Sequence, residues 1–528
     1  MIFFLPFFFS QVVALPADPK VYDFIVIGAG NAGCPVAAGL VGQGYSVLLV
    51  EDGKAPATEQ DILDQISPRL GFDQWVKDST AYTYNTDEDL LGNRQQILHG
   101  RGLGGTTLIN GGVREIFLQP FSSYSSSSFS DVLLLHPQLY TRPDDQDFDN
   151  WGISFWDSAS VNPFFVEMET YVPATSGHGT SGPVRIQAPL TSQSLEDDIL
   201  GFLEGIDFDI VDDGTSGSAA PGTAFKVKYV RQENGQRLDA FTAFIVPILE
   251  SVSSSLLTVV SNTRATEILF NEGTPNVVIG AHFLTGGKNS WRAFVNHEVI
   301  ISAGTFGTPK LLQLSGIGAS ADLVNAGITP RVSLPQVGKN LIARPLSLLA
   351  FSGTELLPDQ DISQLANTTA IEQFLSGAGG WYSIPIDGLI GFGATNPAAS
   401  LSDFMIQFTT VQPFFYLPIP TAFGFPCLLN HPVSRGFVTA VSANPFDDPR
   451  VFSGIFTDTE GVDLTNMAAC ISLVSRVRNN NKNFFLFYFV FNLPFFFFLS
   501  VQGGCCCRWC GSAGFDGRRD YSRFVVHW

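Results

Sequence analysis

Basic residues are scarce in this chain of 528 residues, and charge of either sign is sparse. There are 29 lysines and arginines against 49 aspartates and glutamates, so the formal net charge is −20. That charge repels a phosphate backbone and excludes nucleic acid as a partner. Only 15% of residues are charged, whereas 45% are hydrophobic and 51 are glycine, which indicates a compact, loop-rich α/β enzyme rather than disorder. The length allows about two or three domains.

Cysteine is rare as well. Three of the seven cysteines stand apart, and the other four form one cluster: Cys34, Cys427, Cys470, and then Cys505, Cys506, Cys507 and Cys510. The cluster has no partner pair at zinc-finger spacing, so no metal site is expected. The spacing indicates no disulfide framework either.

The N-terminus lacks the basic start of a secretory signal. Residues 1–14 nevertheless carry an apolar run followed by small residues at Ala14 and Ala17, which resembles the core and cleavage site of a signal peptide. The sequon at Asn367 also fits a secretory route. We therefore predict a secreted, extracellular protein with a possible signal segment at residues 1–20.

The most informative stretch is residues 21–33. Tyr22 to Ile27 is a short run rich in β-branched and aromatic residues, typical of a buried parallel strand. Gly28, Gly30 and Gly33 follow as G-x-G-x-x-G. In such a turn the first glycine permits the bend, the second lets backbone approach a pyrophosphate, and the third lets the next helix, at about residues 33–42, pack on the strand. The N-terminus of that helix favours phosphate.

A second strand, residues 45–50, ends at Glu51, where the ribose-binding acid of a βαβ unit is expected. A carboxylate here accepts hydrogen bonds from ribose hydroxyls and repels a 2′-phosphate, so FAD or NAD fits better than NADP. The alternative is a solvated carboxylate at a strand end.

A second glycine-rich loop spans residues 102–112. Its glycines and hydroxyls can press backbone donors against a large flat ligand. A flexible linker is the alternative, but a linker would not interleave Leu103, Leu108 and Ile109 with its glycines. The candidate contacts in and beside the loop are Gly102, Gly105, Thr106, Asn110, Gly111, Gly112 and Val113.

Together with the βαβ unit, this loop resembles the flavin-contacting signature of the glucose-methanol-choline (GMC) oxidoreductases, nearest to their glucose oxidase and aryl-alcohol oxidase branches. Other blocks match in the family's order. They are Phe148 to Trp151 with Phe164 and Phe165, His178 to Val184, Leu257 to Thr266, Ser302 to Gly318, and the S-R-G and D-P-x-x-x-P blocks within residues 431–449, where Asn444 replaces the usual Asp.

The resemblance implies FAD as cofactor and an alcohol or sugar as substrate, with oxygen or a quinone reoxidising the flavin. It adds Asn31 and Ala32 to the phosphate turn and places the adenine contact at Ala265. The family's proton-accepting His, which acts while hydride leaves for flavin N5, lies in its C-terminal region. No matching motif is found among the seven histidines, so no catalytic residue is assigned. His431 is expected to be structural.

The Ser302 block also has a physical interpretation. Residues 298–302 form a strand that delivers a second tight turn, Ala303-Gly304, to the ligand-binding edge of the sheet. Pro309 is then expected near the first turn of a helix over residues 310–314. Residues 341–345, where the family has L-x-D-H-P, read Leu-Ile-Ala-Arg-Pro, which puts a helix start there in doubt.

The predicted fold is a two-domain α/β flavoprotein, with a doubly wound, Rossmann-like FAD domain and a substrate domain built on a mixed or antiparallel sheet. Residues 21–330 form the FAD-binding region with parts of the substrate domain, residues 331–430 a substrate-domain segment, and residues 431–477 the start of the C-terminal family region, with an amphipathic helix from Asp463.

After residue 477 nothing resembles the family, and residues 484–499 are rich in phenylalanine. Three interpretations compete: a membrane tail anchor, a buried pair of core strands, or a translated intron over residues 478–502 followed by a shifted frame to residue 528. We favour the third, because A/T-rich non-coding text yields this Asn, Lys and Phe bias. The phenylalanines of residues 3–9 resemble the same kind of text.

The sequence thus predicts an FAD-dependent alcohol or sugar oxidase or dehydrogenase that turns over slowly or not at all as written. Two other classes stay open. An NAD-dependent dehydrogenase would share the βαβ unit, and a non-catalytic, membrane-tethered flavoprotein would follow if the phenylalanine-rich run is real.

Overall fold

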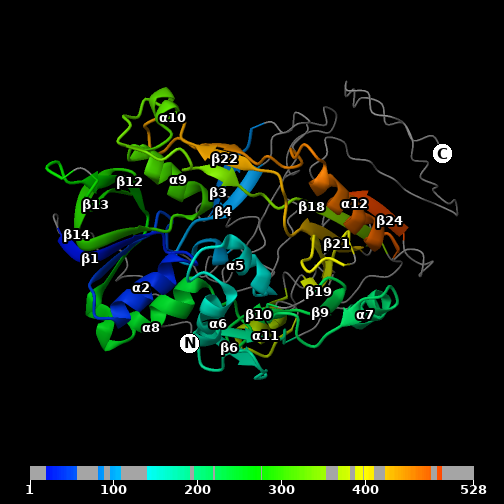
Figure 1. Cartoon of the computed structure of the whole chain (residues 1–528). Coiled ribbons are helices and arrows are strands. Elements are labelled where there is room, and N and C mark those ends of the chain that lie inside the picture. The colour runs from blue at the N-terminus through cyan, green and yellow to red at the C-terminus, as the bar shows by residue number, and fades with distance from the viewer. Residues whose placement is uncertain are drawn as a thin grey trace.

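The computed structural model describes residues 20–55, 81–87, 96–108, 139–190, 195–217, 220–274, 276–352, 367–380, 387–396, 398–409, 422–476 and 485–489. Two large sheets dominate it, a six-stranded sheet on the left of Figure 1 and a seven-stranded sheet on the right. The predicted α/β architecture with a mixed second sheet is confirmed.

The six-stranded sheet carries the dinucleotide-binding motif. Its order is β11 (Leu257–Val260), β2 (Val47–Val50), β1 (Lys20–Ile27), β14 (Asn289–Ile301), β13 (Val278–Thr285) and β12 (Thr263–Phe270). The first four strands are parallel, while β13 and β12 are antiparallel to their neighbours. The predicted strands at residues 22–27 and 45–50 are therefore the two central parallel strands.

Side chains of β1 and β2 alternate between two buried layers because successive residues of a strand face opposite ways. Val26 and Leu49 pack with helix α2 (Gly33–Gly42), while Ile25 and Leu48 pack on the other face. Figure 1 shows α2 together with α8 (Val246–Leu249) on one side of this sheet. Burial on both faces explains why these strands are continuously apolar.

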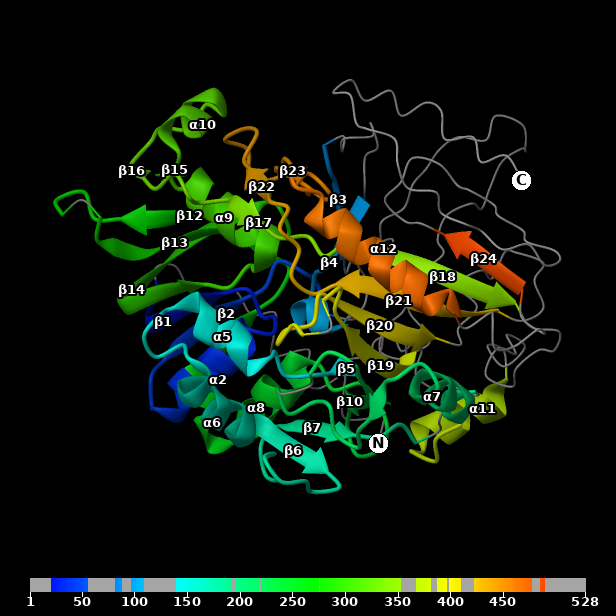
Figure 2. The same ribbon diagram turned by 45° about the vertical axis from the view of Figure 1, so that its right-hand side comes forward.

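The seven-stranded sheet has the order β24 (Phe485–Phe489), β18 (Leu346–Ser352), β21 (Ala422–Leu429), β20 (Phe404–Thr409), β19 (Asp387–Gly393), β9 (Thr223–Lys226) and β8 (Asp209–Ile210). All pairs are antiparallel except β8 with β9. Figure 2 shows α12 (Val462–Val474) lying across this sheet. The antiparallel wall and the helix from Asp463 are thus where the sequence places them.

Smaller elements complete the described chain. A four-stranded sheet has the order β5 (Leu139–Tyr140), β10 (Lys228–Val230), β7 (Val184–Gln187) and β6 (Glu169–Val172). Further strands are β3 (Ala81–Asn85), β4 (Gln96–Gly100), β15 (Ile317–Gly318), β16 (Val332–Ser333), β17 (Lys339–Leu341), β22 (Gly436–Thr439) and β23 (Arg450–Phe452). The remaining helices are η2 (Gly105–Leu108), α5 (Asp145–Trp151), α6 (Ser158–Met168), α7 (Glu196–Glu204), η3 (Phe241–Ile245), η4 (Val252–Leu256), α9 (Gly304–Leu314), α10 (Ser320–Asn325) and α11 (Thr368–Leu375).

Two local predictions are wrong. Helix α9 begins at Gly304, so Pro309 lies inside the helix rather than near its first turn. The glycine turn itself starts the helix. The helix then accommodates Pro309 at the loss of one backbone hydrogen bond, because proline has no N–H to donate. The structure also joins Cys427 on β21 to Cys470 on α12 by a disulfide with a Cα–Cα distance of 6.1 Å. The spacing of 43 residues concealed this pair, because only the fold brings α12 onto β21.

Two uncertain segments acquire a structure. No helix starts within residues 342–345, and Arg344 instead donates to the carbonyl of Leu429. Phe485–Phe489 forms β24, an edge strand paired with β18. Among the residues that the structure describes, no helix is long and apolar enough to cross a membrane. The remainder of the phenylalanine-rich run lies outside the described residues.

Candidate functional site

A cavity of about 610 Å³ opens at the carboxyl ends of β1, β2 and β14. Nine residues selected from the sequence line it: Gly28, Gly30, Asn31, Ala32, Glu51, Gly105, Thr106, Ala265 and Gly304. Gly33 and Gly102 support its wall from behind. Asn110, Gly111, Gly112 and Val113 lie outside the described residues.

The glycines are required by close backbone approach. A Cβ on Gly28, whose φ is +102°, would lie 2.3 Å from the carbonyl oxygen of Ser302. A Cβ on Gly33 would lie 1.9 Å from the carbonyl oxygen of Gly28, and one on Gly105 would lie 2.7 Å from the Cα of Gly30. The turns after β1 and β14 and the loop after β4 therefore touch through bare backbone, which leaves room for a ligand to approach their amide groups.

Two helix N-termini face this cavity. Ala32 precedes α2 and Ala303 precedes α9, and neither provides a side-chain cap for the first amide groups. Uncapped N–H groups with the positive end of the helix dipole form a site for an anion such as a phosphate.

Glu51 is buried at the end of β2, with 7% of its surface exposed. Its carboxylate accepts from the N–H of Ala29 at 3.0 Å, of Gly53 at 2.8 Å and of Gly102 at 3.1 Å. Burial raises the pKa of Glu51 to about 7, against the opposing effect of these donors. Glu51 thus ties the first glycine turn to the second glycine-rich loop, and the interpretation as a solvated carboxylate is wrong.

A cluster of charged side chains at another part of the cavity was not predicted from the sequence. Asp52 pairs with Arg264 at 2.8 Å and with Arg101 at 3.2 Å. Arg264 and Lys310 both donate to the carbonyl oxygen of Pro445. Only the fold reveals these contacts, since Asp52 and Arg264 are separated by 212 residues.

His99 also lines the cavity and was not selected from the sequence. It lies on β4, and its Nε2 is 2.3 Å from the position of a Cβ on Gly304. The ring contacts Phe306 edge-on at 5.7 Å, and Nδ1 lies 3.5 Å from the Thr106 hydroxyl. In the sequence, the one signal for His99 is its position shortly before the second glycine-rich loop.

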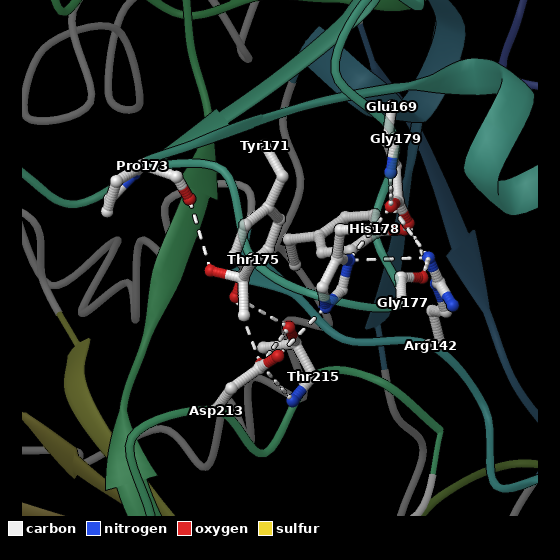
Figure 3. A network of polar contacts seen from close by, with 11 residues as sticks. Arg142, Glu169, Tyr171, Pro173, Thr175, Gly177, His178, Gly179, Asp213 and Thr215 are labelled. Carbon is white, nitrogen blue, oxygen red and sulfur yellow. Dashed lines mark hydrogen bonds and ion pairs between the residues drawn. The ribbon is translucent and has the colours of Figure 1, made fainter.

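The other described histidines lie outside the cavity. His178 is buried between two carboxylates, with Nδ1 2.8 Å from Glu169 and Nε2 2.9 Å from Asp213 (Figure 3). Its ring stacks on Tyr171 with centroids 3.8 Å apart. His431 bonds Asp147 and the carbonyl of Ser402, in keeping with the structural role expected of it.

The comparisons with known proteins agree with this geometry. Residues 137–346 match the family model described as GMC oxidoreductase. Glucose dehydrogenase [FAD, quinone] of Drosophila pseudoobscura pseudoobscura is 29% identical over 473 residues, which cover 84% of this chain and 68% of the relative. Alcohol oxidase of Pichia angusta is 26% identical over 484 residues, with the same two coverages of 84% and 68%.

Solved structures share the fold. Formate oxidase of Aspergillus oryzae RIB40 aligns with a TM-score of 0.73 at 20% identity, covering 88% of this chain and 82% of that one. A fungal aryl-alcohol oxidase aligns with a TM-score of 0.68 at 19% identity, covering 88% and 84%.

The fold and the cavity define a protein of the dinucleotide-binding class. Within that class, residues 137–346 match the GMC oxidoreductase model, so the predicted resemblance is confirmed. GMC oxidoreductases depend on FAD, so the prediction of FAD as cofactor is confirmed by this match.

Proposed function

We propose that this cavity binds FAD and that the protein oxidises a CH–OH group of an alcohol or sugar. The observation that carries the proposal is the buried carboxylate of Glu51, which binds backbone of two glycine-rich segments at once. Its place at the end of β2 suits the ribose hydroxyls of the adenosine, while the turn at Gly28, Gly30 and Gly33 suits the pyrophosphate. Ala265 on β12 lines the same cavity, and we expect its backbone to contact the adenine.

FAD, when bound, accepts the two electrons of the substrate C–H bond. The chain's own residues would position it: the N-terminal amide groups of α2 and α9 would bind the phosphates, and the close-packed glycines would let backbone approach the cofactor. The relatives' names support an alcohol or sugar as substrate. One relative is named for a quinone and another is named an oxidase, so either a quinone or oxygen fits as acceptor.

We also propose that turnover by the chain as written is slow or absent. His99 is the one described histidine that lines the cavity, and it lies beside the phosphate turns. His136 and His527 lie outside the described residues. Oxidation of an alcohol at ordinary rates by recombinant protein of this sequence would contradict this part of the proposal.

Secretion is supported by the disulfide between Cys427 and Cys470, because disulfides form and persist in oxidising compartments. Expression with and without passage through a secretory pathway, followed by thiol counting, tests this. We expect the secreted protein to lack free thiols at both positions.

The purified protein tests the cofactor directly. We expect a yellow protein whose bound flavin is FAD and whose absorbance bleaches on anaerobic addition of a suitable alcohol only if a catalytic base is present. A colourless protein that binds NAD would instead favour the NAD-dependent dehydrogenase.

A further inference from the structure

His99 sits where two phosphate-binding turns meet. Its Nε2 abuts Gly304, the first residue of α9, and Gly304 itself has a φ of +79° that leaves its Cβ position to the imidazole. Gly28 contacts Ser302 and Ala303 directly before this residue. The ring therefore lies against the turn after β14, and that turn in turn contacts the turn after β1.

The other cationic side chains of the cavity already have protein partners. Arg101 and Arg264 pair with Asp52, and Lys310 donates to the carbonyl of Pro445. A pyrophosphate brings two negative charges to the glycine turns, where backbone amides supply only partial positive charge. His99 is the titratable side chain placed at those turns.

We propose that His99 binds the FAD pyrophosphate as an imidazolium, so that FAD binding takes up a proton at this residue. The inference rests on the proposed FAD site. His99 acts here as a positioning residue, since it holds the cofactor and takes no part in the oxidation itself. The proton comes from solvent and remains on the ring while the phosphate is bound.

The surroundings of the His99 ring determine whether FAD affinity rises or falls with pH. In the protein without FAD, burial lowers the pKa of His99 below its ordinary value. Its neighbours are the Thr106 hydroxyl from η2 and the Phe306 ring from α9. A phosphate at contact distance favours the charged ring and raises the pKa, because an opposite charge stabilises the imidazolium. FAD affinity should then fall as the pH rises between the two pKa values.

Other titratable groups share the cavity: Glu51, Asp52, Arg101, Arg264, Lys310 and Asp448. Burial raises the pKa of Glu51 to about 7, and ribose hydroxyls that donate to its carboxylate would make affinity rise with pH. Burial lowers the pKa of Lys310 to about 8, so it adds a loss of affinity at higher pH. These contributions are common to wild type and to any His99 variant, and they cancel in a ratio of affinities.

The test is the ratio of FAD dissociation constants, variant over wild type, measured by equilibrium dialysis of the holoprotein from pH 5.5 to 9. For His99→Gln we expect a ratio of roughly ten to one hundred at low pH, falling towards one at high pH, since an ionic hydrogen bond is lost only where the ring is charged. For His99→Arg, whose charge is permanent, we expect a ratio near one at low pH that drops below one at high pH. His282→Gln is the matched control, because His282 is a half-buried histidine on β13 outside the cavity whose pKa is also lowered by burial.

A His99→Gln ratio that does not vary with pH would overturn the inference, because a merely structural ring would shift affinity equally at every pH. If His99→Gln fails to fold, His99→Arg decides: a pH profile parallel to wild type overturns the inference. Wild-type protein that binds no flavin would overturn the proposed function as well, whereas flavin binding with an unchanged His99 ratio overturns only the role of His99.

Discussion

Two glycines of α2 differ in why glycine is present: Gly33 is required by a close backbone contact, whereas Gly39 is not. A Cβ on Gly33 would meet the carbonyl oxygen of Gly28 at 1.9 Å, whereas a Cβ on Gly39 would meet no atom within 4 Å. We predict that Gly33→Ala loses bound flavin and lowers the melting temperature. Gly39→Ala should keep its flavin and gain roughly 0.5–1 kcal/mol of stability, because alanine is the better helix former. Flavin absorbance and thermal unfolding of the pair measure both effects; equal behaviour of the two variants would argue against the glycine turn.

Glu51 is the residue on which the adenosine end of the site depends. Glu51→Gln keeps the shape but loses the charged acceptor, and one carboxylate oxygen is replaced by an NH2 donor that faces backbone N–H groups. We predict FAD affinity weakened roughly ten- to one-hundredfold, the usual range for a hydrogen bond to a charged group. Equilibrium dialysis measures it, with the exposed Glu272→Gln as control. Unchanged affinity in Glu51→Gln would remove Glu51 from the site.

At the scale of elements, the network in Figure 3 joins the segment after β5, strand β6 and the segment after β8. Arg142 donates two hydrogen bonds to the carboxylate of Glu169, and the two side chains are only 4% and 1% exposed. Glu169→Gln leaves a buried guanidinium partly unpaired, so we predict a loss of about 3–5 kcal/mol in the free energy of unfolding. The surface pair of Lys226 with Asp197 is the control, and Asp197→Asn should cost less than about 1 kcal/mol. Urea denaturation compares them.

The same network gives stability a dependence on pH. Burial alone would raise the pKa of Glu169, but the hydrogen bonds from Arg142, Tyr140 and His178 outweigh burial and lower it. Because the folded pKa lies below the unfolded value of about 4.3, the stabilisation is complete above that value and is lost as the pH falls through the folded pKa. We predict that wild type loses more stability on acidification below about pH 4 than Glu169→Gln does. Parallel acid titrations of the two proteins would contradict this account.

The disulfide fastens α12 to β21 across a separation of 43 residues. Replacing Cys427 and Cys470 by alanine together should lower stability by about 2–4 kcal/mol, since the unfolded chain regains the freedom that the cross-link removes. Thermal unfolding with and without reductant checks it. Wild type should become less stable in reductant while the double variant does not change; a wild type insensitive to reductant under unfolding conditions would speak against the bond.

Elements built from local pattern could be predicted, and elements built from distant contacts could not. The strand, turn and helix of residues 20–42 follow from a buried apolar run and three glycines, and α2 begins and ends where the pattern places it. The disulfide and the contact of His178 with Asp213 instead join residues that are 43 and 35 positions apart. The helix of the second signature was placed too late because Pro309 was given more weight than the glycine turn before it.

At the scale of the whole molecule, the site is an assembly of loops at one edge of the six-stranded sheet. Most residues of its wall could be predicted from the sequence, because each glycine turn is recognisable from its glycine spacing and from the strand before it. It missed His99 and the pairing of Asp52 with Arg264, because a side chain's place in a cavity depends on which loops meet there. The cofactor class was therefore easier to predict than the side chains that tune its binding.

We propose above all that this chain binds FAD at the cavity built around Gly28, Glu51 and Gly304. The most direct measurement is the flavin content of the purified protein, released by denaturation and identified as FAD by the rise in fluorescence after phosphodiesterase cleavage. The account predicts one FAD per wild-type chain and none in Gly33→Ala. Wild-type protein without FAD, or Gly33→Ala with a full complement of it, would contradict the claim.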